Sequence, residues 1–325
     1  MKALIHHTFG NPAEVLAVDE AQTPEPGPGE ARVRLTLSPI HNHDLWTVAG
    51  TYGFKPELPA RAGTEAVGIV EAVGEGVEHL QPGTRVATGG TFGVWAEQFV
   101  AKAAALIPVP DGIPDEVAAQ LVAMPFSAIS LLDSLELAEG DWMIQNAANG
   151  AVGRLVAQLA KARGINVVGL VRRTDGIAEL EAQGIDRIVA TDTDGWQERV
   201  LEITGGAPLK VGVESVGGQA AGDVMSQIAE NGTLVVFGAM ASPTMEIGSG
   251  DVIFKQATIR GFWGSKVSAA MPAEDRARLM RELFARLSDG TITLPVEATF
   301  AFDDIAAAVK AHFTPGRAGK ILLKP

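Results

Sequence analysis

The clearest hydrophobic pattern of the chain lies over residues 141–173. Residues 142–145 form a short run typical of a buried strand, and apolar side chains then recur at helical spacing from Val152 to Ala160. Gly164 follows this stretch at the kind of position where helices commonly end. The β-branched residues over 165–171 predict a second strand. Together these residues predict a strand–helix–strand unit with parallel strands.

The alternation of strand and helix patterns continues toward residue 261. Strands are expected where short β-branched runs occur, and helices where apolar residues recur with the helical period. Strands separated by helices are typical of a doubly wound parallel sheet. Helices are expected over 116–135 with a break near Pro125, 176–183, 195–203, 219–230 and 272–287, and strands over 188–190, 211–216, 233–237 and 257–261.

Residues 1 to about 110 follow a different pattern, in which short strands alternate with turns rich in glycine and proline. This pattern indicates a compact, partly open β-barrel. We therefore expect an α/β protein with two domains: a β-rich domain made of residues 1–121 and 266–325, and a parallel-sheet domain over 122–265. Strands of the first domain are expected over 2–5, 30–37, 66–73, 84–87 and 95–100.

Composition and charge limit the possible partners. The 325-residue chain has 39 acidic and 26 basic residues and a net charge of −13 at pH 7, which argues against nucleic acid or an anionic membrane as its partner. It contains no cysteine, which excludes disulfides and thiolate metal ligands. The first residues lack a signal-peptide pattern and no apolar run is long enough to span a bilayer, so we expect a cytoplasmic protein.

The turn inside the first strand–helix–strand unit is a candidate binding site. Ala147, Gly150 and Gly153 form the pattern Ala-x-x-Gly-x-x-Gly where the strand is expected to end and the helix to begin. Small residues there let the backbone approach a pyrophosphate, and the helix amino terminus offers free N–H groups. In this context the motif predicts a Rossmann-type dinucleotide site.

The end of the second strand bears on which dinucleotide is bound. NAD sites commonly place an acidic residue there to bind the ribose hydroxyls. Here Arg172 and Arg173 occupy the position, followed by Thr174, and arginine pairs well with a 2′-phosphate. The sequence therefore favours NADPH. The alternative is a ribose bound by Asp175, with the arginines as solvated loop charges.

Several motifs resemble those of a known superfamily. In chain order they are Ser-Pro-Ile at 38–40, Gly-Thr-Tyr-Gly at 50–53, Pro-Glu-Leu-Pro-Ala at 56–60, Gln-Asn-Ala at 145–147 and Arg-Gly-Phe-Trp at 260–263. The chain resembles the medium-chain dehydrogenase/reductase superfamily over essentially its whole length, and looks most like the zinc-free 2-enoyl thioester reductases and quinone oxidoreductases. The resemblance implies a GroES-like barrel domain, a Rossmann domain and a homodimer, since many relatives pair through the sheet edge near residues 252–261.

The resemblance also implies roles for individual residues. Tyr52 matches the catalytic acid of the enoyl thioester reductases. Other positions match segments that wrap the pyrophosphate, receive the 2′-phosphate or border the nicotinamide, and one matches a lysine near the carboxy terminus that reaches the cofactor. The implied cofactor-binding residues are Asn149, Gly150, Ala151, Val152, Gly153, Arg172, Arg173, Thr174, Phe237, Gly238, Ala239, Met240, Phe262, Trp263 and Lys320.

The chain departs from the enoyl reductases at two positions. His41 stands where those enzymes have an asparagine after Pro-Ile, and Met124 replaces a second asparagine. Both positions lie close to the nicotinamide in the resembling family, so the resemblance leaves the choice of acceptor open. His41 is a candidate for a secondary proton donor, because imidazoles titrate near neutral pH.

The zinc alcohol dehydrogenases of the same superfamily provide a comparison for metal binding. Their zinc ligands match His41, Thr64 and Met124, none of which is a cysteine. We therefore expect no metal. The alternative is a nitrogen–oxygen site made of His41, His43, Asp44 and Glu65.

Tyr52 is the only tyrosine and lies on a glycine-flanked turn. A phenolic hydroxyl is protonated at neutral pH and can donate its proton. Reduction of an electron-poor double bond requires a hydride at one carbon and a proton at the other. We therefore expect an NADPH-dependent, metal-free reductase that acts on an activated C=C bond of a small molecule, a 2-enoyl thioester or an enone, with Tyr52 as proton donor. The alternatives are an NADPH:quinone oxidoreductase, a zinc-type alcohol dehydrogenase and a non-catalytic NADPH-binding protein.

Overall fold

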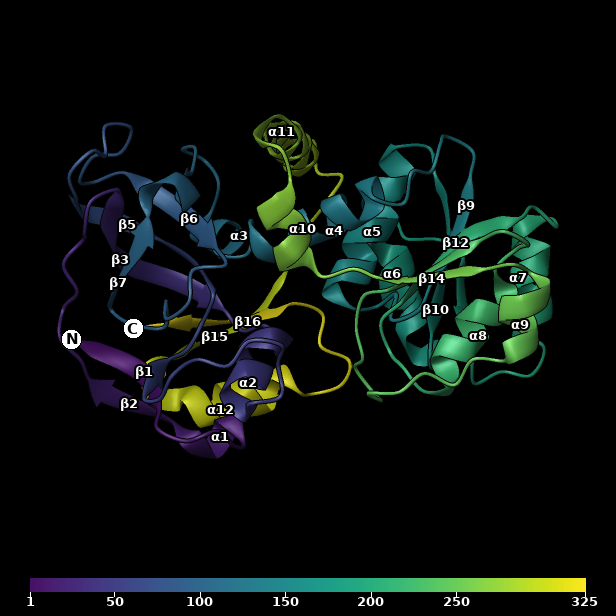
Figure 1. Ribbon diagram of the computed structural model, residues 1–325, viewed down its shortest axis with the longest axis horizontal. Helices are drawn as coiled ribbons and strands as arrows, with labels where there is room; N and C mark the ends of the chain where they lie inside the picture. Colours follow the sequence, from purple (N-terminus) through teal and green to yellow (C-terminus); the bar gives the residue numbers. More distant parts are fainter. The chain divides into compact units, whose positions relative to one another are not determined.

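The computed structural model describes residues 1–325, which divide into two compact units (Figure 1). Unit 1 consists of Met1–Ala123 and Leu294–Pro325, and unit 2 consists of Met124–Thr293. The predicted α/β class, with a β-rich unit and a parallel-sheet unit, is confirmed. The carboxy-terminal boundary differs from the prediction, because residues 266–293 belong to unit 2 rather than to the β-rich unit.

Contacts of the helix α11 (Ala273–Ser288) explain this difference. Arg278 donates to both carboxylate oxygens of Asp133, at 3.1 and 2.9 Å, within unit 2. Leu279 and Leu283 of the helix are fully buried. The helix was correctly expected from its apolar period, but a local pattern does not indicate which domain receives its apolar face.

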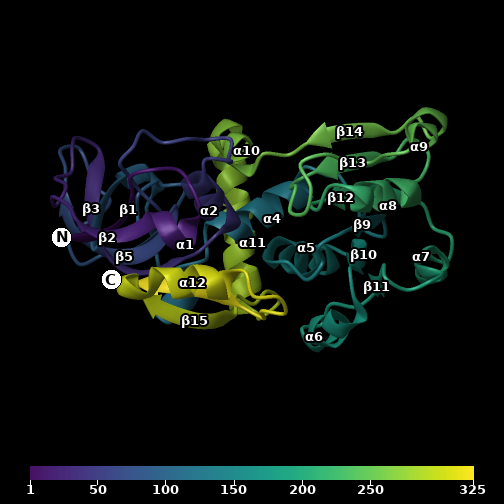
Figure 2. The same ribbon diagram turned by 90° about the horizontal axis from the view of Figure 1, so that it is seen from below.

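Unit 2 contains a six-stranded parallel sheet in the order β11-β10-β9-β12-β13-β14, with helices on both faces (Figure 2). The inner strands are rich in valine, isoleucine and leucine because they are covered on both sides. This is the predicted doubly wound sheet. Its elements are α4 (Ala123–Asp133), β9 (Trp142–Gln145), α5 (Ala151–Ala162), β10 (Asn166–Val171), η2 (Thr174–Gly176), α6 (Ile177–Ala182), β11 (Ile188–Ala190), α7 (Trp196–Thr204), β12 (Leu209–Glu214), α8 (Gln219–Gln227), β13 (Thr233–Val236), α9 (Ser249–Phe254), β14 (Thr258–Gly261), α10 (Gly264–Ala270) and α11.

Unit 1 is built around a seven-stranded sheet, in which β15-β16-β3-β5-β6-β8 are neighbours in that order and β7 pairs with β3, and a smaller sheet of β2-β1-β4. The long strand β3 pairs with three other strands, and Trp95 is fully buried in the core beneath them. The elements are β1 (Lys2–His6), α1 (Pro12–Val15), β2 (Leu16–Glu20), β3 (Glu30–Pro39), α2 (Asn42–Ala49), β4 (Ala60–Arg61), β5 (Glu65–Val73), β6 (Arg85–Gly89), β7 (Gln98–Lys102), η1 (Ala103–Ala105), β8 (Ile107–Pro108), α3 (Asp115–Ala118), β15 (Val296–Ala301), η3 (Phe302–Asp304), α12 (Ile305–His312) and β16 (Lys320–Lys324).

The observed helices differ from the predicted ones at two places. The break expected near Pro125 lies earlier, between α3 and α4, because a proline in the first turn of a helix lacks only an N–H that would have no helical partner. The helix α2 does not follow from the hydrophobic pattern, since its first turn is polar. The Asp44 carboxylate caps it by accepting the backbone N–H of His41 at 2.9 Å, and Gly50 ends it at a φ of 74°. None of the helices combines the length and apolar character needed to cross a membrane.

The chain leaves unit 1 and returns to it at neighbouring points. Unit 1 is interrupted after Ala123 and resumes at Leu294. The side chain of Gln120, just before the exit, donates a hydrogen bond to the carbonyl oxygen of Leu294 at 2.9 Å. Glu65 Oε1 accepts the backbone N–H of Ala123 at 2.6 Å. Ala123 and Leu294, where the chain leaves and re-enters unit 1, are therefore both hydrogen-bonded to other residues of that unit.

Candidate functional site

The predicted dinucleotide turn of unit 2 connects β9 to α5. Ala147 has a φ of 50°, and Gly150 precedes the first residue of the helix. A Cβ atom on Gly153 would lie 2.6 Å from the carbonyl oxygen of Ala147 and 2.9 Å from Cα of Ala148. Only glycine therefore fits at position 153, and the amino end of α5 packs directly against the turn. This cradle fits the pyrophosphate of a dinucleotide.

Glu214, the last residue of β12, is a buried acidic residue of unit 2. Its Oε1 accepts the backbone N–H groups of Val216 and Gly217, both at 2.6 Å, and the side-chain amide of Asn146 at 3.1 Å. Asn146 Oδ1 in turn accepts the backbone N–H of Ser215 at 2.8 Å. These bonds fix the turn beside the glycine motif. Sequence reasoning missed Glu214, although a single acid at the end of an apolar strand was a possible signal.

The two arginines follow β10 and are exposed, as is Thr174. Arg173 Nε lies 3.4 Å from Oδ2 of Asp175, and the side chains of this pair are 50% and 72% exposed. Both guanidinium groups are therefore accessible to an anion from solvent. The carboxylate of Asp175 is exposed as well.

The remaining predicted cofactor residues of unit 2 follow β13 and β14. The rings of Phe237 and Phe262 lie 5.9 Å apart between centroids. Phe262 is buried, whereas Trp263 is 40% exposed and has the ammonium group of Lys266 4.8 Å from its ring. The residues Gly238, Ala239 and Met240 continue the loop after β13. These positions share the carboxyl edge of the parallel sheet with the glycine turn, where α/β sheets bind ligands.

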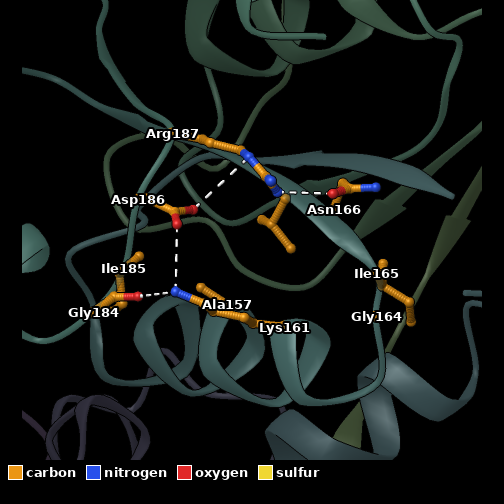
Figure 3. A pocket seen from close by; sticks show the side chains of 10 residues that line it. Ala157, Lys161, Gly164, Ile165, Asn166, Gly184, Ile185, Asp186 and Arg187 are labelled. Atoms are coloured by element: carbon orange, nitrogen blue, oxygen red, sulfur yellow. Dashed lines mark hydrogen bonds and ion pairs between the residues drawn. The ribbon is translucent and has the colours of Figure 1, made fainter. Parts of the chain in front are cut away.

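A cavity of about 210 Å³ lies at the opposite edge of the same sheet (Figure 3). It is lined by Asn166, the first residue of β10, and by Arg187, which precedes β11. Its charged side chains are already paired, since Lys161 Nζ lies 3.3 Å from Asp186. Because it lies at the amino ends of the strands, this cavity is separate from the predicted cofactor site.

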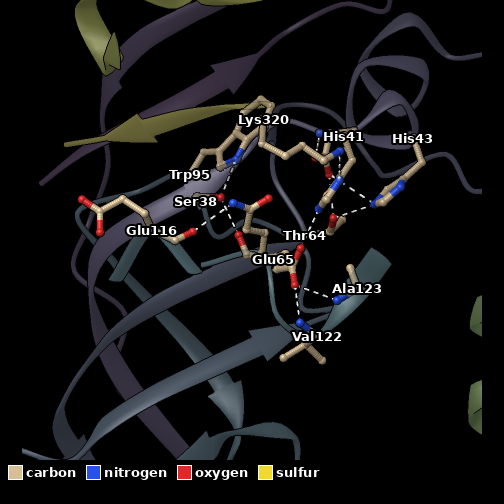
Figure 4. A network of polar contacts seen from close by, with 12 residues as sticks. Ser38, His41, His43, Thr64, Glu65, Trp95, Glu116, Val122, Ala123 and Lys320 are labelled. Carbon is tan, nitrogen blue, oxygen red and sulfur yellow. Dashed lines mark hydrogen bonds and ion pairs between the residues drawn. The ribbon is translucent and has the colours of Figure 1, made fainter. Parts of the chain in front are cut away.

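Unit 1 contains a buried polar cluster centred on His41 (Figure 4). His41 Nε2 lies 2.7 Å from Glu65 Oε2, and His41 Nδ1 lies 3.0 Å from Lys320 Nζ. The other oxygen of Glu65 accepts the backbone N–H groups of Val122 and Ala123, both at 2.6 Å. Because an ammonium group can only donate, Nδ1 accepts from Lys320 and Nε2–H donates to Glu65. Both ring nitrogens of His41 are therefore occupied within unit 1.

Burial shifts the proton affinities of this cluster toward the uncharged forms. It raises the pKa of Glu65 to about 8 and lowers the pKa of Lys320 to about 8. Burial, and then the positive charge of Lys320, lower the pKa of His41 well below its usual value. His41 is therefore a neutral bridge between two groups that carry opposite charges when ionised.

A second series of polar contacts in unit 1 begins at His43, which neighbours His41. His43 Nε2 lies 2.7 Å from Thr64 Oγ1, and the Thr64 hydroxyl donates to Asp44 Oδ1, also at 2.7 Å. The ring of His43 stacks on that of His41 with centroids 5.0 Å apart. On its other side it meets the ring of Tyr52, with centroids 5.8 Å apart. The structure therefore brings Tyr52, the predicted proton donor, next to His43 rather than His41.

The cluster does not fit a zinc ion. Thr64 offers a hydroxyl, which is a poor zinc ligand, and the nitrogens of His41 are occupied. The ammonium group of Lys320 beside Nδ1 would repel a cation. No group of three or more histidine, aspartate and glutamate side chains in the structure is arranged to hold a metal ion.

Comparison with known proteins agrees with this two-unit architecture. Residues 27–111 match the family described as alcohol dehydrogenase GroES-like domain, and residues 151–283 match the family described as zinc-binding dehydrogenase. The chain is 30% identical over 329 aligned residues to the mitochondrial enoyl-[acyl-carrier-protein] reductase of Homo sapiens, covering 99% of this chain and 88% of the relative.

Two solved structures extend the comparison over the whole chain. The quinone oxidoreductase of Pseudomonas syringae pv. tomato DC3000 is 28% identical, with a TM-score of 0.88 and 100% of both chains covered. The quinone oxidoreductase of Escherichia coli, solved in complex with NADPH, is 25% identical, with a TM-score of 0.90 and the same coverage. With its GroES-like and dinucleotide-binding units, the chain belongs to the medium-chain dehydrogenase/reductase superfamily and is a nicotinamide-dependent oxidoreductase.

Proposed function

We propose that the enzyme reduces an electron-poor carbon–carbon double bond, that of a 2-enoyl thioester or an enone, with NADPH as reductant and Tyr52 as proton donor. The observation that carries the proposal is the placement of Tyr52 beside the His43 imidazole. The backbone N–H of Tyr52 is held at 3.2 Å by the carbonyl of Trp46, directly after the helix α2. The name of the human relative, an enoyl reductase, supports the same substrate class.

The residues of unit 2 fit NADPH. Arg172, Arg173 and Thr174 would bind the 2′-phosphate, since exposed guanidinium groups recognise phosphate well. When bound, NADPH supplies the hydride that adds to one carbon of the double bond. The backbone around Gly153 would hold the pyrophosphate. The other residues of unit 2 proposed to contact the cofactor are Asn149, Gly150, Ala151, Val152, Phe237, Gly238, Ala239, Met240, Phe262 and Trp263. Lys320 of unit 1, which contacts His41, is also proposed to reach it.

Tyr52 would protonate the second carbon. His41 contributes to this site indirectly, because its two nitrogens already contact Lys320 and Glu65. A proton on His41 can pass only to one of these two groups. We propose that this reaction needs no metal, in keeping with the poor fit of the cluster to zinc.

Quinone reduction is the second candidate function, and the names of the two bacterial structures favour it. A quinone accepts its protons on oxygen, where exchange with water is fast, so an acid positioned at carbon is unnecessary. The two functions therefore differ in their dependence on Tyr52.

A panel of acceptors assayed by NADPH consumption tests the proposal. We expect turnover with enoyl thioesters or enones, and a loss of roughly 100-fold in kcat for Tyr52→Phe. Phe313→Leu, at an exposed ring of unit 1, is the control and should keep wild-type turnover. Turnover with quinones alone, unaffected by Tyr52→Phe, would establish the second candidate. Tight NADPH binding without oxidation by any acceptor would indicate a non-catalytic protein.

We also propose a homodimer that pairs through β14. This strand has only one neighbour in its sheet, and Ile259 on it is 39% exposed. Ile253 and Phe254 of α9, just before it, are 64% and 82% exposed. An edge strand beside exposed apolar side chains is a common pairing surface. Light scattering of the purified enzyme measures its oligomeric state.

The cytoplasmic location expected from the sequence stays a prediction. The human relative is named as mitochondrial, so cell fractionation is the measurement that decides between the two compartments.

A further inference from the structure

A proton donor must recover its proton after each turnover. Reduction of a double bond with NADPH takes up one proton in addition to the hydride. If Tyr52 supplies it, the phenolate that remains must be protonated again from solvent. A side chain that touches both Tyr52 and solvent is suited to this step.

His43 meets this requirement better than His41. The side chain of His43 is 22% exposed, whereas that of His41 is 1% exposed. The His43 ring lies against Tyr52 on one side and against His41 on the other. Both nitrogens of His41 are occupied, whereas a single nitrogen of His43 contacts Thr64.

The contacts of Thr64 fix the protonation pattern of the His43 ring. The Thr64 hydroxyl has one hydrogen, which it donates to Asp44. Thr64 Oγ1 is therefore the acceptor in its contact with His43, and Nε2 of the imidazole carries the proton. In neutral His43 the lone pair then lies on Nδ1, which is able to take up a proton.

Asp44 is placed to stabilise the protonated ring. Its carboxylate is fully buried and lies 3.6 Å from His43 Nε2. Burial lowers the pKa of His43, whereas the charge of Asp44 raises it. The other ionisable groups around this ring are His41, which stacks on it, Lys320, whose charge disfavours the imidazolium, and Glu65 behind His41. Asp44 is thus the nearest group that favours a positive charge on His43.

We infer that His43, oriented by Thr64 and Asp44, is the positioning residue of Tyr52 and the group that returns its proton. The Tyr52 O–H bond breaks as its proton joins the substrate carbon. Neutral His43 takes a proton from solvent on Nδ1, and the imidazolium gives this proton to the phenolate oxygen. The net uptake is one solvent proton per turnover, as the proposed reduction requires.

The inference rests on the proposed function, and His43→Gln tests it. A glutamine amide can still donate to Thr64 from the place of Nε2 but has no basic nitrogen. We expect kcat for the enone or enoyl thioester to fall roughly 10- to 100-fold with KM changed less than about threefold, and the pH dependence of kcat to lose one ionisation. His79→Gln, in a loop of unit 1, is the matched control and should behave as wild type.

Two further variants separate proton return from a merely structural role. Added imidazole should restore part of the turnover of His43→Ala, because a free base can occupy the vacated space. Thr64→Val should lower kcat, whereas Thr64→Ser, which keeps the hydroxyl, should restore it. These threonine variants also provide the test if the histidine variants do not fold.

Several results would overturn the inference. Wild-type kcat and an unchanged pH profile in His43→Gln would do so, as would a rise in KM alone with no rescue by imidazole. If His43→Gln gives either result while Tyr52→Phe loses most of its turnover, only the role of His43 is refuted and the proposed function still holds. Wild-type turnover of Tyr52→Phe would instead refute Tyr52 as proton donor, and this inference with it.

Discussion

The ammonium nitrogen of Lys320 lies 3.0 Å from Nδ1 of His41, inside the buried cluster of unit 1. Lys320 begins the strand β16, and His41 precedes the helix α2, so the contact joins the two ends of the unit in sequence. On the far side of the imidazole lies Glu65. A neutral imidazole thus joins a buried lysine to a buried glutamate.

Lys320→Met should destabilise the enzyme. The methionine fills a similar volume but cannot donate to His41 Nδ1. The buried ring nitrogen loses its partner, which we expect to lower the free energy of unfolding by roughly 1 to 3 kcal/mol. Urea unfolding measures the change. Lys324→Met, at the exposed end of the same strand, should have little effect. Equal stability of the two variants would show that the contact of Lys320 with His41 is unimportant for folding.

Metal removal should leave the enzyme intact. The purified protein should contain far less than one zinc ion per chain, and dialysis against a chelator should not change its turnover, since the ring nitrogens of His41 are already occupied. Atomic emission spectroscopy gives the metal content. Stoichiometric zinc, with activity lost on chelation and regained on zinc addition, would restore the alcohol dehydrogenase alternative.

Replacing both Arg172 and Arg173 by alanine should remove the proposed preference for NADPH. Loss of two phosphate partners should raise the Kd of NADPH roughly 10- to 100-fold and leave that of NADH within about threefold. Fluorescence titration measures both constants. Arg199→Ala, at an exposed arginine of α7, is the control. A comparable loss of affinity for both cofactors would argue against a 2′-phosphate site.

Gly153→Ala should damage the dinucleotide turn. The new methyl group would overlap the backbone of Ala147 and Ala148, so the helix α5 must move away from β9. We expect a lower melting temperature and at least roughly tenfold weaker NADPH binding. In Gly250→Ala the new Cβ meets only the Phe254 ring at ordinary contact distance, and this variant should bind normally. Unchanged binding by Gly153→Ala would contradict the assigned cradle.

His312 should make the enzyme sensitive to acid. Burial, with the nearby charges of Lys320 and Arg317, lowers the pKa of His312 to about 3, against 6.5 for an exposed histidine. Between these values the unfolded chain binds a proton that the folded one does not. Stability is therefore fully present above pH 6.5 and falls as the pH drops toward 3, by roughly 2 to 4 kcal/mol from this group.

The variant His312→Asn isolates this contribution. Its unfolding free energy should depend less on pH between 6.5 and 4 than that of the wild type, as measured by urea unfolding at a series of pH values. Parallel curves for the two proteins would show that His312 is not the acid-sensitive group.

The parallel sheet and the dinucleotide turn could be predicted because each depends on residues close together in sequence. The turn at Ala147 to Gly153 lies between a strand and an amphipathic helix, and both produce regular local patterns. The helix α2 could not be predicted in this way. Its polar first turn holds His43 and Asp44, whose partner Thr64 lies about twenty residues further on.

The contacts of the cluster could not be predicted either. The resemblance indicated Lys320 and His41 separately, but the two are 279 positions apart and nothing local links them. The same limit explains the error over 266–293, since the helix α11 takes its partners, such as Asp133, from a distant helix. Long-range pairing of charged groups leaves no period in the sequence.

The exit and the return of the chain at Ala123 and Leu294 have an evolutionary consequence. The side chain of Gln120 donates a hydrogen bond to the carbonyl of Leu294, which holds the two points close together. Unit 2 is therefore inserted into unit 1 between two neighbouring positions. One such unit could be exchanged for another by recombination while the buried polar cluster of unit 1 keeps its contacts. Preference for a reductant and choice of an acceptor could then diversify independently within a lineage.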